Sequence, residues 1–119
     1  MSAELPYNTD ITIYHRTGDQ WETHHIEQAL WLDNITTAAH DKEGIIYKHV
    51  VKLFLRPNSL SFTPACGVDF VLKDKGPEID NTTPATISSS LKAIKNKKNI
   101  LEFSYFSFGN LPHIEAILN

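Results

Sequence analysis

The amino-acid sequence predicts a mainly β protein: a small antiparallel β-barrel of about six strands, with one short helix near residues 84–96 and long inter-strand loops. Three observations support this fold class. Apolar and polar residues alternate along several short stretches, turn residues separate these stretches at hairpin spacing, and a helical pattern occurs only once. Strands without alternating helices favour an antiparallel sheet, and closure into a barrel removes its exposed edges.

The first half of the chain is rich in strand patterns. Residues 10–16 and 21–32 flank the turn sequence "TGDQ", so they predict a hairpin. Residues 33–46, "DNITTAAHDKEGII", show no sustained period, and we expect a long loop there. The stretch "IYKHVVKLFLR" that follows is rich in β-forming residues and predicts the next strand.

The second half contains the remaining strands and the helix. "VDFVLKDKG" alternates after a loop with two prolines, and further strands are expected at residues 100–107 and 113–118. Before the helix, Thr83 and Pro84 are typical of an N-cap and a first-turn proline. Apolar residues at helical spacing give residues 84–96 one apolar face: Ile87, Leu91 and Ile94.

Length and composition indicate one ordinary domain, residues 1–119, in which residues 1–8 are expected to be a flexible N-terminal arm. No apolar run approaches the roughly 18 residues that span a membrane, so we expect no membrane contact. The start "MSAELPYNTD" lacks the pattern of a signal peptide, and Cys66 is the single cysteine. Both features favour a protein that folds in a reducing cytoplasm.

Charge argues against tight nucleic-acid binding. The chain has 11 Lys and Arg against 14 Asp and Glu, a net charge of −3, whereas such binding needs many basic contacts. We therefore expect no sequence-specific nucleic-acid partner. The aromatic strand "EFSYFSF" keeps one alternative open, a small barrel that binds single-stranded nucleic acid or an oligosaccharide.

The stretch "YHRTGDQWETHH", residues 14–25, concentrates groups that bind metals or transfer protons. Neighbouring strand residues point to opposite faces, so His24 and His25 cannot join one site on a regular strand. The chain also lacks the G-x-S-x-G and H-E-x-x-H motifs and a phosphate-binding glycine loop. We therefore expect a protein that is not an enzyme, with no catalytic residue and no cofactor.

One hairpin register would nevertheless assemble a metal set. With a two-residue Gly18-Asp19 loop, His15 lies opposite Glu22, and both share a face with His24. Two histidines and one carboxylate can bind a metal, whereas a shift by one residue breaks the set. The main expectation is a solvated hairpin tip without metal; a His-dependent metal enzyme using His15, Glu22 and His24 is the second alternative.

The order of features resembles a known family. "DITIYHR", a strand with Trp that closes in "ALW", a long loop, "VVKLFLRP", "GVDFVLKD" and "ILEFSYFSFGNLPHIEAIL" follow one another. This order is similar to that of the small head–tail connector proteins of tailed bacteriophages and prophages, also called head-closure, head–tail joining or minor capsid proteins. The resemblance covers roughly residues 7–118. The segment that holds the 84–96 helix departs from the simplest members of the family.

The resemblance implies a structural virion protein. Members of the family are small β-barrels that form homo-oligomeric rings at the head–tail interface, where they bridge portal or adaptor and tail proteins and help to retain packaged DNA. Such a subunit is made in the host bacterial cytoplasm. The 33–46 segment is too apolar for a purely solvated loop. It either folds onto its own barrel or contacts a neighbouring subunit or the portal, and the residues expected to make that contact are Ile35, Ala38, Ala39, Ile45 and Ile46.

Overall fold

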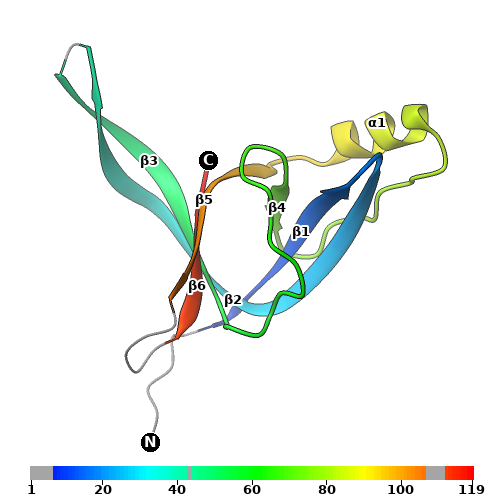
Figure 1. Cartoon of the computed structure of the whole chain (residues 1–119), viewed down its shortest axis with the longest axis horizontal. Coiled ribbons are helices and arrows are strands. Elements are labelled where there is room, and N and C mark those ends of the chain that lie inside the picture. The colour runs from blue at the N-terminus through cyan, green and yellow to red at the C-terminus, as the bar shows by residue number, and fades with distance from the viewer. Residues whose placement is uncertain (1–6, 43, 107–111) are drawn as a thin grey trace, which may run out of the picture.

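The computed structural model describes residues 7–42, 44–106 and 112–119, and within them it confirms the barrel with six strands and one helix (Figure 1). The elements are β1 (Thr9–Thr17), β2 (Gln20–Asp41), β3 (Gly44–Leu55), β4 (Phe70–Lys73), α1 (Pro84–Ala93), β5 (Lys98–Phe106) and β6 (His113–Leu118). Neighbouring strands are antiparallel and close in the order β1-β2-β3-β6-β5-β4. No helix in this part of the chain is long and apolar enough to cross a membrane.

The first hairpin has the register that a two-residue loop requires. Thr17 pairs with Gln20 and His15 with Glu22. Gly18 has a φ of +63°, which is the backbone that the first position of such a tight loop needs. The strands β1 and β2 therefore place His15, Glu22 and His24 on one face, as the sequence predicted for this register.

The prediction of a loop over residues 33–46 was wrong. These residues form the outer parts of β2 and β3, which pair from Ile35↔Val50 to Asp41↔Gly44. We call residues 35–41 and 44–50 the arm; Figure 1 shows that it projects well away from the barrel. A ribbon of two strands exposes both of its faces, so its residues have no reason to alternate between apolar and polar. Long connections do occur elsewhere, at residues 56–69 and 74–83.

Strand β1 is buried on both faces, which ties the barrel to the helix. Ile11 and Ile13 point into the barrel interior, whereas Tyr14 belongs to a second cluster outside it. The interior is filled mainly by aliphatic side chains, among them Ile11, Ile13, Leu53, Leu55, Val71, Ile100 and Leu118. The second cluster contains the three residues of the predicted apolar helix face: Ile87, Leu91 and Ile94.

Helix α1 begins as predicted and ends earlier. The Thr83 hydroxyl accepts a hydrogen bond from the Thr86 amide, and the Thr86 hydroxyl accepts one from the Thr83 amide, which completes a capping box. The helix ends at Ala93 instead of residue 96 because Ile94 adopts an extended conformation. The Lys97 ammonium group then donates to the Leu91 carbonyl at 3.1 Å, which satisfies one carbonyl of the last turn.

The described part of the expected N-terminal arm contacts the barrel. Residues 1–6 lie outside the described residues. The Asn8 amide donates to the Ala29 carbonyl at 2.9 Å, and the Arg56 guanidinium lies 5.0 Å from the centre of the Tyr7 ring. Asn8 therefore extends the pairing of β1 with β2, whereas Tyr7 contacts Arg56 just after β3.

The connection after β4 is fastened to the outer face of β1 by polar contacts. The Tyr14 hydroxyl donates to the Pro77 carbonyl at 2.9 Å. The Thr12 hydroxyl donates to the Asp74 carbonyl and accepts from the Gly76 amide, both at 2.9 Å. Two buried side chains of one strand thus hold residues 74–77 in place before the chain enters the helix.

Tyr14 should make the protein less stable at high pH. Burial raises the pKa of its phenol above the usual value of 10.0. The stabilisation by the neutral phenol is therefore complete below pH 10 and is lost as the pH rises from there through the higher pKa of the folded state. Urea unfolding between pH 8 and 12 measures this loss. The difference in unfolding free energy between wild type and Tyr14→Phe should shrink over this range, and a constant difference would contradict the assignment.

Candidate functional site

A cluster of polar and aromatic side chains covers one end of the barrel interior, beside the β1–β2 turn. The histidine cluster, as we name it, consists of His15, Glu22, His24, Phe62 and Asp69. Three of its members come from the first hairpin, and two come from the 56–69 connection that crosses toward β4. The cluster therefore joins two parts of the chain that are far apart in sequence.

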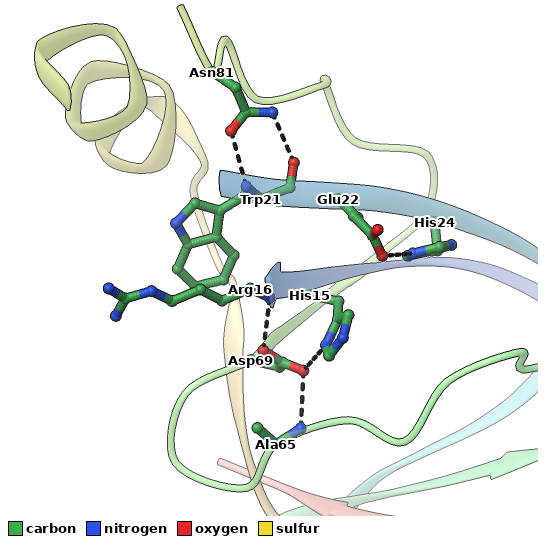
Figure 2. A network of polar contacts seen from close by, with 8 residues as sticks. All are labelled: His15, Arg16, Trp21, Glu22, His24, Ala65, Asp69 and Asn81. Carbon is green, nitrogen blue, oxygen red and sulfur yellow. Dashed lines mark hydrogen bonds and ion pairs between the residues drawn. The ribbon is translucent and has the colours of Figure 1, made fainter. Parts of the chain in front are cut away.

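Asp69 is the centre of this cluster, and it is 0% exposed. Figure 2 shows its carboxylate between β1 and the connection. One oxygen accepts from the Arg16 amide at 3.0 Å, and the other accepts from the Ala65 amide at 2.8 Å. The second oxygen also lies 2.6 Å from His15 Nδ1. A carboxylate that accepts hydrogen bonds from two amides has no proton to donate. His15 Nδ1 is therefore the donor in this contact and carries the proton.

Phe62 contacts both histidines that the sequence placed in one candidate metal set. Its ring lies 4.4 Å from the His15 ring and 4.3 Å from the His24 ring, measured between centroids. His24 Nε2 is 3.0 Å from a Glu22 oxygen, on the exposed side of the cluster. The three residues share a face, but His15 contacts Asp69 while Glu22 contacts His24.

The geometry does not assemble a metal centre from these side chains. Among the described residues, no group of three or more His, Cys, Asp or Glu is arranged to hold a metal ion. The contacts of the cluster instead fasten the 56–69 connection to β1, with Leu60 and Phe62 packed on the barrel core. We call this arrangement the polar latch, because His15 and the Arg16 amide contact Asp69 and thereby join the hairpin to the connection.

The other face of the hairpin carries a second set of contacts. The Asn81 side chain accepts from the Trp21 amide at 2.8 Å and donates to the Trp21 carbonyl at 2.9 Å (Figure 2). Asn81 thus pairs with β2 as the backbone of a neighbouring strand would. His25, which alternation separates from His24, lies 3.0 Å from the Gly76 carbonyl. These contacts position the segment that leads to α1.

Asp69 was missed by sequence reasoning, although the sequence carried a signal. The alternation of "VDFVLKD" places Asp69 on the same side as Val71, and Val71 is fully buried in the barrel. A carboxylate at an interior position needs several hydrogen-bond donors, so a polar contact could have been expected there. Its partners could not be identified, because 53 or more residues separate Asp69 from His15 and Arg16.

The arm is the second candidate site, and it contains the predicted contact residues. Ile45 is 56% exposed, Ala38 is exposed and Ile35 is half-buried. The side chains of Ala39 and Ile46 lie outside those that the structure describes. Positions 35, 39 and 46 share one face of the ribbon, whereas positions 38 and 45 share the other. A partner that contacts all five must therefore reach both faces.

The arm leaves the barrel beside a small cavity of about 190 Å³. Asp33, His49 and Lys98 line it together with apolar residues of β3 and β6. Ligand pockets in proteins usually measure about 300–1,000 Å³, so this cavity is too small for a typical organic ligand. It is better described as the notch at the base of the arm.

Comparison with known proteins gives one match. A family described as a family of unknown function, DUF6751, matches residues 6–117. No curated protein matches the chain, and no solved structure matches it either. The function must therefore be inferred from the site geometry and from the order of sequence features.

Proposed function

We propose that this chain, which belongs to the DUF6751 family, is a structural protein and acts as a head–tail connector subunit of a tailed phage or prophage. In this role it forms a homo-oligomeric ring that bridges portal or adaptor and tail proteins and helps to retain packaged DNA. The subunit is made in the host bacterial cytoplasm and ends up at the head–tail interface of the virion.

The arm is the observation that supports this proposal most. A two-stranded ribbon is at best marginally stable alone in water. This ribbon extends for seven paired residues on each strand beyond the last pairing of β3 with β6, and it exposes Ile45 near its tip. A segment of this kind is suited to contact another protein, as a subunit of a larger assembly would.

The histidine cluster supports a structural role as well. Its titratable side chains contact one another and the 56–69 connection, and the Phe62 ring contacts both histidine rings. These contacts stabilise the barrel end. The order of features from "ITIYHR" to "HIEAIL", similar to that of connector proteins, narrows the structural role to the head–tail interface.

Deletion of the gene from a phage or induced prophage that encodes it tests the function. We expect free tails and tailless heads that have lost DNA in electron micrographs, no complete virions, and a loss of infectious particles. Supplying the wild-type chain from a plasmid should restore them, and mass spectrometry should find the chain in purified virions.

Two matched variants test the part played by the arm. Ile45→Lys places a charge on the arm, and Val68→Lys places one on the 56–69 connection, where Val68 is 40% exposed. We expect Val68→Lys to restore virion assembly and Ile45→Lys to fail. Normal titres of complete virions in the deletion strain would overturn the proposed function, and full rescue by Ile45→Lys would remove the arm from it.

A further inference from the structure

We propose that copies of this chain join by strand addition, in which the open edge of the arm on β3 in one copy pairs with an open edge of β5 in the next copy. The inference rests on the proposed function, because it names the partner and the contact that would build the ring.

The first open edge lies on the arm. Strand β6 pairs with β3 only from Val51 to Leu55. In the described registers, residues 44–50 of β3 therefore have β2 as their single strand neighbour. The backbone N–H and C=O groups that point away from β2 are then available for a further strand.

The second open edge lies on β5. Strand β4 is short and pairs with β5 only at Lys98 and Asn99, and the Gly67 amide donates to the Ile100 carbonyl at 2.9 Å. Beyond this point, the registers of the described strands give residues 101–105 one neighbour, β6. Leu101 and Tyr105 on this strand are 47% and 55% exposed. Apolar exposure and an unpaired edge thus coincide.

The surface of the chain is larger than a compact monomer requires. Its accessible surface is 7657 Å², whereas a compact protein of 13.5 kDa exposes about 6,500 Å². The radius of gyration is 15.7 Å against about 13.5 Å for a compact chain of this length, in keeping with the projecting arm.

A second copy of the chain is the partner that fits both edges. One molecule carries an edge that reaches outward and a different edge that stays on the barrel, so each copy can donate to one neighbour and accept from another. Contacts of this head-to-tail kind generate rings when the rotation closes.

A charge on the accepting edge tests the inference on the full chain. Leu101→Lys adds a residue that natural edge strands use against pairing, and Val68→Lys is its control at an exposed apolar position outside both edges. Sedimentation equilibrium should show concentration-dependent association of the wild type, unchanged in Val68→Lys and weakened about tenfold or more in Leu101→Lys. Circular dichroism checks that both variants fold. A wild type that stays monomeric up to its solubility limit would overturn the inference, as would equal association of both variants.

Cross-linking identifies the two edges directly. In a Cys66→Ser background, chains with His49→Cys on the arm are mixed with differently tagged chains with Ser104→Cys on β5, and a short bis-maleimide is added. We expect cross-links between the two tags. Chains with Ser88→Cys, at an exposed position of α1, should give none with Ser104→Cys. Cross-links confined to pairs of His49→Cys chains would indicate arm-to-arm contact and contradict the proposal.

The inference and the proposed function fail in different experiments. If deletion of the gene abolishes virions while the purified chain neither associates nor cross-links, the connector role stands and the strand-addition contact falls. If the chain associates through the two edges but virions assemble without it, the strand-addition contact is supported and the connector role is contradicted.

Discussion

Replacing Asp69 with alanine is expected to lower the free energy of unfolding by about 3–5 kcal/mol. The substitution removes the acceptor of three donors: His15 Nδ1 and the amides of Arg16 and Ala65. These groups sit around a carboxylate that is fully buried, so water cannot readily replace it. Urea unfolding followed by the fluorescence of Trp21 and Trp31 measures the loss.

A carboxylate on the surface of the same barrel is the control. Glu27 is exposed on β2, and Glu27→Ala should change stability by less than about 0.5 kcal/mol. His15→Ala combined with Asp69→Ala should cost less than the sum of the two single changes, because the two side chains share a contact. A loss below about 1 kcal/mol for Asp69→Ala would show that the latch is not needed to hold the connection.

Gly76→Ala is expected to destabilise the protein by about 1–3 kcal/mol. An added Cβ would lie 2.1 Å from the Tyr14 hydroxyl oxygen and 2.6 Å from Leu72 Cδ2. The Leu72 side chain can move, but the Tyr14 ring is buried and its hydroxyl donates to the Pro77 carbonyl. The clash therefore forces either the ring or the 74–77 segment to shift. Urea unfolding again measures the effect.

The Tyr14 hydroxyl should account for most of this cost. In a Tyr14→Phe background the oxygen that the new Cβ would meet is absent, so Gly76→Ala should cost clearly less than in the wild type. Gly67→Ala offers a comparison of another kind. Nothing lies within 4 Å of its Cβ position, but its φ of +80° makes a side chain unfavourable. Equal costs of Gly76→Ala in both backgrounds would rule out the clash as the cause.

The strands that face the barrel interior could be predicted because burial imposes a period on the sequence. Strand β6 has the predicted bounds, and the 10–16 strand differs from β1 by one residue at each end. The sequence left the hairpin register open; the structure has the two-residue Gly18-Asp19 loop, from which the pairs down to Ile11↔Ile26 follow. In these segments the turn residues and the alternation of apolar and polar residues indicate the same strands, and such segments can be predicted from sequence.

The β2 half of the arm could not be predicted because burial does not select its residues. Among the arm side chains that the structure describes, Val50 is the one that is buried, so "ITTAAH" carries no alternation that would reveal a strand, whereas the stretch from Ile46 onward was predicted as a strand from its β-forming residues. The sequence around Gly44, whose φ is +128°, was the available sign of a turn. Five apolar residues were recognised as candidates for a contact, while their division between two faces required the register.

The sequence indicated the hairpin residues of the candidate site but not the residues from the 56–69 connection. His15, Glu22 and His24 were placed on one face by local reasoning, but Phe62 and Asp69 enter from a connection whose path depends on the closed barrel. Contacts between residues so far apart in sequence leave no local pattern. These partners change the interpretation from a solvated hairpin tip, with a metal set as the alternative, to a cluster that joins the hairpin to the 56–69 connection.

The closure of the barrel through β4 also has a consequence for the order of folding. The hairpins β1–β2 and β2–β3 join neighbouring segments, and such local ribbons form in about 1–10 μs. Strand β4 pairs with β1 across about sixty residues, from Ile11↔Lys73 to Tyr14↔Phe70, and the loop entropy of this closure must be overcome first. We therefore expect two hairpins that share β2 to form early, and the barrel to close slowly around them.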